Sequence, residues 1–186
     1  MSFPIVCINL AKRPDRWNQF STQPGLPSSL KRFPAVDGRA LSIAEDTRIS
    51  PETRLRIQIK KRRSHGEINT PGAIGCSLSH YSIWTQLTDS PFTLICEDDT
   101  RLSPFFLKLV ESYLPTLPES ADLWILSWRT FTAQTHGKPF AGPWQTPPPF
   151  WGTNCYLLRK SSVPKLTANF FPIESHLDRY FQTLQQ

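Results

Sequence analysis

Three consecutive carboxylates, Glu97-Asp98-Asp99, directly follow the apolar run Phe92–Cys96. Alternate side chains of an extended backbone share a face, so Glu97 and Asp99 should point one way and Asp98 the other. Adjacent carboxylates repel one another unless a cation or hydrogen-bond donors neutralise them. Mn²⁺ and Mg²⁺ prefer oxygen ligands of this kind, and open α/β sheets bind ligands outside the carboxyl ends of their strands. The run therefore indicates a metal and ligand site, although a solvated acidic turn also fits it.

A second group of candidate residues stands at an expected helix start. The segment Gly72–His80 combines small residues with the pair Ser79-His80. Small side chains let backbone donors approach a ligand closely. Taken singly, Ser79 and His80 are more typical of packing or capping, and Asp37-Gly38 is a common turn dipeptide.

The elements that must position these residues alternate between short apolar strands and segments of helical period, which is typical of an α/β layer fold. A length of 186 residues suits one domain. Thr70 and Pro71 should open a helix, and Ser103-Pro104 another with Phe106, Leu109, Val110 and Tyr113 facing inward. The expected strands are 5–10, 33–36, 92–96, 123–126 and 151–158, and the other expected helices are 15–20, 162–170 and one around 177–184.

The charge of the chain is concentrated in one segment. Six of the 21 Lys and Arg lie within residues 54–63, and the remaining 15 are balanced by 15 Asp and Glu, which argues against a nucleic-acid-binding protein. The segment of about 48–70 lacks a clean apolar face, so we expect a mobile basic insertion there. Contact with an acidic or phosphorylated acceptor is the alternative. Residues 132–149 are rich in Pro and Gly and should form a rigid loop.

The four cysteines, at positions 7, 76, 96 and 155, show no spacing typical of zinc or redox sites. Buried free thiols in a reducing compartment are the expectation. The sequence shows no secretory signal and no apolar stretch of the roughly 20 residues that a membrane span needs. We therefore expect a cytoplasmic protein without a transmembrane segment.

Five motifs follow one another along the chain. They are Ile8-Asn9-Leu10 with Arg13, Asp15-Arg16 and Trp17; Ala35-Val36-Asp37-Gly38; Thr70 to His80 with Trp84; Glu97-Asp98-Asp99; and Gly152-Thr153-Asn154-Cys155-Tyr156-Leu157-Leu158. In this order they resemble glycosyltransferase family 25, the group of lipopolysaccharide-type and collagen galactosyltransferases. The resemblance extends from Ile5 to about Phe181, and its most specific parts are the segment from Gly72 to His80 and the acidic triplet.

This resemblance implies a single GT-A domain, a Rossmann-like α/β/α sandwich with a mostly parallel central sheet. It implies a UDP-sugar donor, galactose or glucose, and Mn²⁺ (or Mg²⁺) between the diphosphate and the acidic residues. The acceptor would be a glycan, a lipid-linked molecule or a protein. The implied nucleotide-sugar-binding residues are Asn9, Arg13, Asp37, Gly38, Ser79, His80 and Asp98, and the implied metal ligands are Glu97 and Asp99.

The segment from Pro172 to Asp178 corresponds to an acidic motif that completes the site in the family. It suggests His176 as a further metal ligand, Asp178 as the general base and Glu174 as the next candidate for that base. On a helix, Glu174 and Asp178 would share one face at i and i+4. A solvated helix start is the alternative interpretation.

The resulting hypothesis is a metal-dependent glycosyltransferase that moves a hexose to an acceptor hydroxyl, with a carboxylate taking the proton. A catalytically inactive nucleotide-sugar-binding module is one alternative. A metal-dependent phosphohydrolase is another, but it would need clustered Asp and His residues, whereas the four histidines are scattered along the chain.

Overall fold

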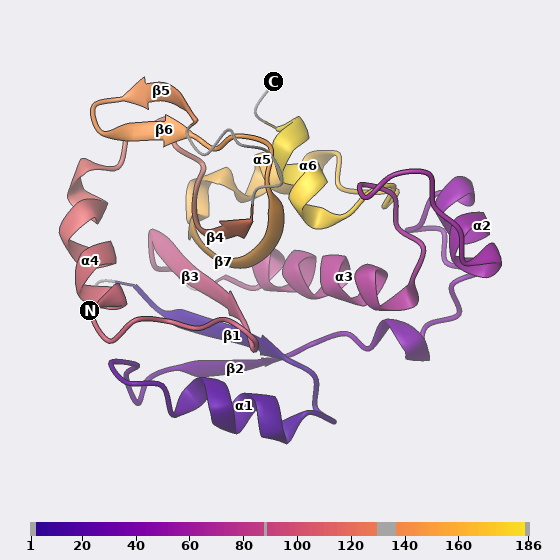
Figure 1. Cartoon of the computed structure of the whole chain (residues 1–186), viewed down its shortest axis with the longest axis horizontal. Helices are drawn as coiled ribbons and strands as arrows, with labels where there is room; N and C mark the ends of the chain where they lie inside the picture. The colour runs from indigo at the N-terminus through magenta and orange to yellow at the C-terminus, as the bar shows by residue number, and fades with distance from the viewer. Residues whose placement is uncertain (1–2, 88, 130–136, 185–186) are drawn as a thin grey trace. The chain divides into compact units, whose positions relative to one another are not determined.

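The computed structural model describes residues 3–87, 89–129 and 137–184 (Figure 1). The chain forms two compact units, Met1–Pro34 with Leu87–Ser162 and Ala35–Gln86 with Val163–Gln186. The single domain expected from the length stays a prediction, and the two units are described in turn. Within the described ranges, no helix is both long and apolar enough to cross a bilayer.

The first unit is built on a five-stranded sheet in the order β2-β1-β3-β7-β4. Strand β1 is parallel to β2 and β3, whereas β7 runs antiparallel to β3 and β4. The expectation of an α/β protein is confirmed, and the sheet is mixed because β7 is inserted between β3 and β4. The strands are β1 (Ile5–Asn9), β2 (Lys31–Pro34), β3 (Phe92–Glu97), β4 (Leu123–Arg129) and β7 (Trp151–Arg159).

Two helices, α1 (Pro14–Ser21) and α4 (Phe106–Tyr113), cover one face of this sheet. That face carries every second residue of the strands, so the core has the two-residue period expected of a pleated sheet. Its buried members are Phe3, Ile5, Cys7, Leu94, Cys96, Cys155 and Leu157 from the N-terminal segment and the strands, with Phe20, Leu107 and Val110 from the two helices. Short 3₁₀ turns, η2 (Leu114–Thr116) and η3 (Lys160–Ser162), follow α4 and β7.

The inward face of α4 differs from the sequence prediction. Leu109 and Tyr113 are 54% and 50% exposed, whereas Leu107 and Val110 are buried. The helix begins at Phe106, and Leu107 and Val110 face the sheet. Of the four residues predicted to face inward, only Val110 and the partly buried Phe106 do so.

A two-stranded sheet, β5 (Lys138–Ala141) with β6 (Trp144–Thr146), occupies part of the predicted loop. The prediction of a loop was therefore wrong over 138–146, and residues 132–136 lie outside the described part of the chain. Trp144 stabilises the hairpin by packing edge-on against Trp124, with ring centroids 4.7 Å apart. Its Nε1 also donates to the Thr116 carbonyl at 2.8 Å. Pro139 is tolerated because each strand of a two-stranded sheet has one edge without a partner.

The second unit contains η1 (Gly38–Ala40), α2 (Pro51–Ile59), α3 (Pro71–Thr85), α5 (Val163–Ala168) and α6 (Leu177–Thr183). Helix α3 begins at Pro71 as predicted. Its Trp84 lies in an aromatic cluster with Phe170 and Phe181, at centroid distances of 5.2 and 5.8 Å. This cluster joins α3 to the C-terminal segment inside the unit.

Helix α2 lies where the sequence predicted no regular element. Ser50 caps it by accepting a hydrogen bond from the Thr53 amide at 3.3 Å, and Pro51 takes its first position. Thr53 and Ile57 are buried, so the helix is packed along one side. The mobility expected for the segment 48–70 stays a prediction.

All four cysteines are free thiols, as expected, and all but Cys76 are buried. Cys96 and Cys155 face each other across β3 and β7 with their sulfur atoms 3.5 Å apart. Burial raises the pKa of the Cys7 thiol far above its ordinary value, so this side chain behaves as a small core residue.

Candidate active site

The acidic triplet lies at the carboxyl end of β3, beside the carboxyl end of β1. The two strands are parallel, with Ile8 opposite Glu97, so Asn9 reaches the residue after Glu97. The Asn9 side-chain amide donates to Asp98 Oδ2 at 2.5 Å, and both side chains are buried. Neighbouring parallel strands thus bring together residues 89 positions apart in the sequence.

Asn9 is the centre of this polar network. Its Nδ2 also donates to the Arg13 carbonyl at 3.0 Å, and its Oδ1 accepts from Arg32 Nε at 2.9 Å. An asparagine amide has two N–H donors and one carbonyl oxygen, so most of its capacity is used inside the protein. Asn9 therefore holds the Asp98 side chain in place. The nucleotide-binding role that the family resemblance implied for Asn9 stays a prediction.

Arg16 of α1 bridges the two aspartates of the triplet. Its guanidinium contacts Asp98 Oδ1 at 3.1 Å and Asp99 Oδ2 at 2.6 Å. One cation between two carboxylates offsets the repulsion that adjacent negative charges would otherwise produce. Burial still raises the pKa of Asp98, against the hydrogen bond from Asn9 and the attraction of Arg16.

Strand β7 supplies polar partners to the other side of the triplet. Asn154 Nδ2 donates to Asp99 Oδ1 at 3.0 Å, and Thr153 Oγ1 donates to Glu97 Oε1 at 3.2 Å. Gly152 precedes them with a φ of +90°, and a Cβ there would lie 2.7 Å from the Asn154 side-chain oxygen. A glycine at 152 therefore leaves room for the Asn154 side chain that contacts Asp99.

Four residues of this network were not predicted as site residues: Arg16, Arg32, Thr153 and Asn154. Arg16, Thr153 and Asn154 belong to motifs noted in the sequence, so proximity to a motif was the available signal. Arg32 stands in no motif and gave none. The predicted Arg13 forms instead a surface ion pair with Asp15 at 2.7 Å, and this hydrogen bond lowers the pKa of Asp15 to about 2.

In the second unit, the segment 36–38 lies directly against the first half of α3. A Cβ on Gly75 would stand 2.4 Å from the Val36 carbonyl oxygen, and one on Gly38 would stand 1.8 Å from the Pro71 carbonyl oxygen. Ser79 Oγ accepts from the Val36 amide at 2.8 Å and donates to the Gly75 carbonyl at 2.6 Å. The small residues of this motif therefore bring two backbones together.

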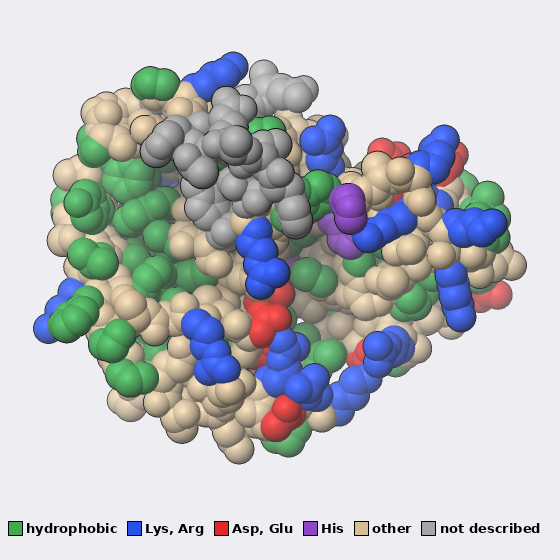
Figure 2. All heavy atoms as spheres, viewed as in Figure 1, with side chains coloured by type: hydrophobic (Ala, Val, Ile, Leu, Met, Phe, Trp, Pro, Cys, Tyr) green, Lys and Arg blue, Asp and Glu red, His purple; other side chains and the backbone are tan. Residues whose placement is uncertain are grey.

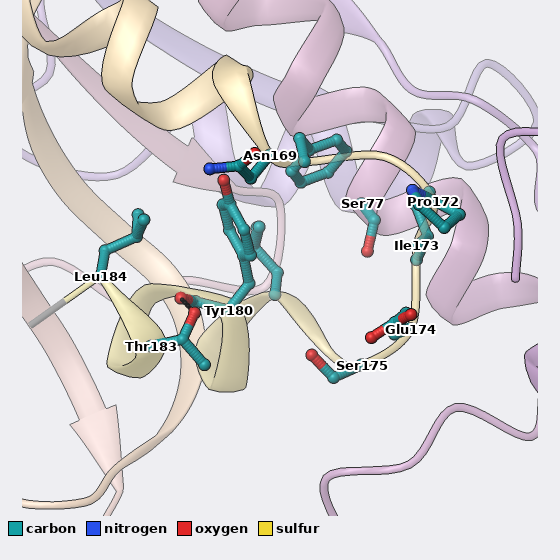
Figure 3. Close-up of a pocket in the computed structure, with 11 residues that line it drawn as sticks. Ser77, Asn169, Pro172, Ile173, Glu174, Ser175, Tyr180, Thr183 and Leu184 are labelled. Atoms are coloured by element: carbon teal, nitrogen blue, oxygen red, sulfur yellow. Dashed lines mark hydrogen bonds between the residues drawn. The ribbon is translucent and has the colours of Figure 1, made fainter. Parts of the chain in front are cut away.

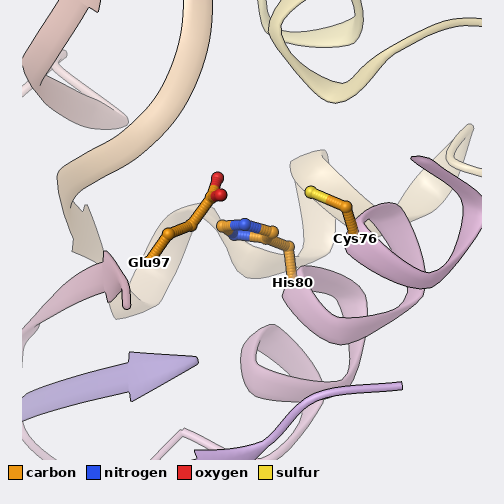
Figure 4. Close-up of side chains that lie close together, drawn as sticks. All are labelled: Cys76, His80 and Glu97. Carbon is orange, nitrogen blue, oxygen red and sulfur yellow. The ribbon is translucent and has the colours of Figure 1, made fainter. Parts of the chain in front are cut away.

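The remaining candidates of this motif lie close by in the same unit. Asp37 caps η1, with its Oδ1 accepting from the Arg39 amide at 3.2 Å. His80 is fully buried, and it projects from α3 one turn after Cys76, as Figure 4 shows. Figure 4 also labels Glu97, which extends from the end of β3 in the first unit.

The C-terminal motif forms an extended segment followed by a short helix. Residue pairs Ile49 with Ile173 and Glu67 with Ser175 form isolated β-bridges, and α6 begins only at Leu177. The prediction that Glu174 and Asp178 share a helical face was therefore wrong, because the bridges hold Glu174 in an extended backbone. Asp178 is buried in the first turn of α6.

His176 stands at the N-cap of α6. Its Nε2 is buried and makes no hydrogen bond within the described part of the chain. Burial lowers the pKa of this histidine, against the pull of the nearby Asp178 charge, and so favours the neutral ring. A neutral imidazole with a free nitrogen lone pair is the form that binds metals.

A cavity of about 310 Å³ lies in the second unit between α3, the extended segment and α6 (Figure 3). Glu174 and Ser175 line it from the extended segment, Ser77 from α3, and Tyr180 and Thr183 from α6. The other lining residues are Asn169 and the apolar Phe170, Pro172, Ile173, Leu177 and Leu184, so the cavity has a mixed polar and apolar wall.

The structure is that of an α/β protein with a hydrogen-bonded cluster of carboxylates at the carboxyl end of β3. Residues 3–141 match the family model "Glycosyltransferase family 25 (LPS biosynthesis protein)". The chain belongs to this family, as its motifs suggested, and so to a family of glycosyltransferase enzymes.

Curated relatives bear names that agree with this membership. A "Glycosyltransferase 25 family member" of Aedes aegypti is 37% identical over 119 residues, covering 59% of this chain and 18% of that protein. "Procollagen galactosyltransferase 1" of Danio rerio is 30% identical over 66% of this chain, and "Procollagen galactosyltransferase 2" of Homo sapiens 31% over the same share. The alignments cover about a fifth of each of these relatives, so the chain corresponds to one part of them.

Proposed function

We propose that this chain transfers a hexose, galactose or glucose, from a UDP-sugar to the hydroxyl group of an acceptor. Family membership and the names of the galactosyltransferase relatives support sugar transfer. The observation that carries the proposal is the buried Asp98, held by Asn9 and Arg16 at the carboxyl end of β3. So much internal hydrogen bonding around one carboxylate is typical of a preorganised site rather than of a solvated acidic turn.

The carboxylates next to Asp98 fit a divalent ion such as Mn²⁺ or Mg²⁺. Asp99 is 49% exposed, and each of its oxygens has one protein partner and a further lone pair. Asp99 and Glu97 would hold the ion. The family resemblance makes His176 the candidate for a third ligand, and its Nε2 makes no hydrogen bond within the described residues. When bound, such an ion neutralises the negative charge of a diphosphate leaving group.

The protein's own residues then have three tasks. Asn9 and Arg16 keep Asp98 and Asp99 in place before a donor arrives, which reduces the reorganisation needed during the reaction. Ser79 and Gly75 of α3 keep the 36–38 turn against the helix, where the nucleotide is proposed to bind. Asp178 is proposed to take the proton from the acceptor hydroxyl as the new glycosidic bond forms, with Glu174 as the alternative base.

Three finer points belong to the same proposal. The fold is proposed to be of the GT-A type, on the strength of the α/β sheet and the family membership. The acceptor is proposed to be a glycan, a lipid-linked molecule or a protein. A cytoplasmic location is proposed because all four cysteines are free thiols, which suits a reducing compartment.

A thermal-shift experiment with UDP-galactose and UDP-glucose, with and without Mn²⁺, tests the donor and the ion together. A donor at one hundred times its Kd stabilises a protein by about 2.7 kcal/mol, which at this chain length corresponds to a shift of about 5–11 °C in Tm. We expect this shift only with Mn²⁺, and we expect Asp99→Asn to abolish it while leaving the unliganded Tm nearly unchanged. Glu119→Gln, an exposed carboxylate far from the triplet in the sequence, is the matched control.

Two results would oppose the proposal. Equal stabilisation in EDTA would show that the triplet does not bind a metal, and no stabilisation by either sugar nucleotide would remove the donor assignment. UDP release in the presence of acceptor peptides or sugars then separates an active transferase from an inactive nucleotide-sugar-binding module, which would show the shift without release.

A further inference from the structure

Helix α2 has two opposite faces that are both partly apolar. Thr53 and Ile57 are buried and fix the helix to the second unit. Leu55 comes two residues after Thr53, and Ile59 comes two residues after Ile57. Two residues are slightly more than half a helical turn, so Leu55 and Ile59 lie on the opposite face of the helix. Their side chains are 56% and 51% exposed. The pair Leu55 and Ile59 therefore forms an outward apolar stripe that is about half exposed.

Basic residues are frequent within α2 and directly after it. Arg56 and Arg63 are paired with Glu67, at 3.6 and 3.2 Å. Lys60, Lys61 and Arg62 are exposed and make no salt bridge within the described part of the chain. The only acidic residue in 51–65 is Glu52, so this surface keeps a clear positive charge.

The backbone presents these cations just beyond the end of the helix. Lys60 adopts a left-handed conformation with a φ of 54°, and the Lys61 amide closes the helix by donating to the Arg56 carbonyl at 3.2 Å. Figure 2 shows Lys and Arg side chains together with hydrophobic ones over the region where Figure 1 places α2. Glycine is the usual residue at a left-handed helix end because it has no side chain to clash with the backbone. Position 60 has a lysine instead, which adds a positive charge at the end of α2.

We propose that Leu55, Ile59, Lys60, Lys61 and Arg62 form a docking surface for an anionic phospholipid bilayer. Lys and Arg complement the charge of anionic headgroups, and the neighbouring Leu and Ile can bury their side chains at the boundary of headgroups and acyl chains. A soluble polyanion would use the cations but would gain nothing from the apolar stripe. The combination of both therefore favours a membrane surface over an acidic polymer.

The expected contributions are modest and separable. Each basic side chain near an anionic surface contributes about a fivefold increase in partitioning, and the effect fades within a Debye length. Burying one exposed Leu or Ile side chain contributes about a tenfold increase. The docking surface shares no residue with the carboxylate network, so this inference does not depend on the proposed sugar transfer.

Co-sedimentation of the full chain with vesicles tests the proposal. Vesicles of phosphatidylglycerol and phosphatidylcholine in equal amounts are compared with vesicles of phosphatidylcholine alone, at low salt and at about 1 M salt, where the Debye length is about 3 Å. We expect binding to the anionic vesicles at low salt only. The double substitution Lys61→Glu and Arg62→Glu should abolish it, and Leu55→Ser with Ile59→Ser should weaken it by at least tenfold.

Matched controls come from α4, which carries exposed residues of the same types without a basic cluster. Leu109→Ser and Lys108→Glu should leave vesicle binding unchanged, and thermal unfolding verifies that every variant is folded. Equal binding to neutral and anionic vesicles, or no binding to either, would overturn the proposal. So would full retention by the Leu55→Ser, Ile59→Ser variant, because the surface would then recognise only negative charge, as heparin binding would confirm.

Discussion

Replacing Asn9 by alanine should destabilise the protein even in the absence of any ligand. The substitution removes the donor to Asp98 Oδ2 at 2.5 Å, together with the bonds to the Arg13 carbonyl and to Arg32. Arg32 and the Arg13 carbonyl lie near the surface, where water can replace the lost amide. Asp98 is only 8% exposed, so its carboxylate would lose a partner that water cannot easily replace.

The expected loss follows from the Asp98 contact alone. A hydrogen bond to a buried charged group contributes about 1.5–3 kcal/mol, so we take about 2 kcal/mol for Asn9→Ala. For a chain of this length, 1 kcal/mol corresponds to about 2–4 °C in Tm, so the Tm of Asn9→Ala should be about 4–8 °C lower than that of the unsubstituted protein.

Thermal unfolding followed by circular dichroism, without nucleotide or metal, measures this loss. Asn18→Ala, an exposed position of α1, is the control and should change stability by no more than about 0.5 kcal/mol. If Asn9→Ala unfolds at the same temperature as the control, the network does not hold Asp98 in place. Asn9 would then have to be reconsidered as a residue that acts only on a bound donor.

Three further substitutions test other parts of the structure. Gly75→Ala places a Cβ 2.4 Å from the Val36 carbonyl oxygen, so it should cost about 3 kcal/mol or more, measured by urea unfolding; a neutral result would mean that the two backbones are not in contact. Lys60→Gly relieves a left-handed lysine and should stabilise the protein by about 1 kcal/mol in the same assay; a loss of stability would contradict the helix end described here. Asp178→Asn should reduce turnover by roughly 10²–10⁴-fold while leaving donor affinity nearly unchanged in calorimetry; turnover at the wild-type rate would exclude Asp178 as the base.

The sequence correctly predicted the helices and strands whose apolar pattern or start residues lie within the element itself. The apolar run before Glu97 identified β3, and the Thr70-Pro71 start identified α3. The sequence did not predict elements that are stabilised by contacts with residues distant in the chain. The prolines of 138–149 hid a hairpin that Trp144 stabilises through Trp124, and α2 was missed because only Thr53 and Ile57 face inward.

Distant partners also explain why the sequence predicted only part of the candidate site. The acidic triplet was visible as a sequence run, but its neutralising partners Arg16, Arg32 and Asn154 come from separate segments and share no local pattern with it. At the C-terminus, a helical spacing of Glu174 and Asp178 was inferred from the helix that follows. The β-bridges that keep Glu174 extended depend on residues 49 and 67, more than one hundred positions earlier.

The position of β7 in the sheet has a practical consequence for work with shortened chains. The matched family segment ends at residue 141, but β7 spans Trp151–Arg159 and is the strand that joins β3 to β4. A chain cut at residue 141 would leave β4 without its neighbour and Asp99 without Asn154. During synthesis, likewise, the Asp99–Asn154 contact can form only after residue 154 has emerged from the ribosome. The 150 residues that precede β7, about four-fifths of the chain, are therefore made before this sheet can be completed.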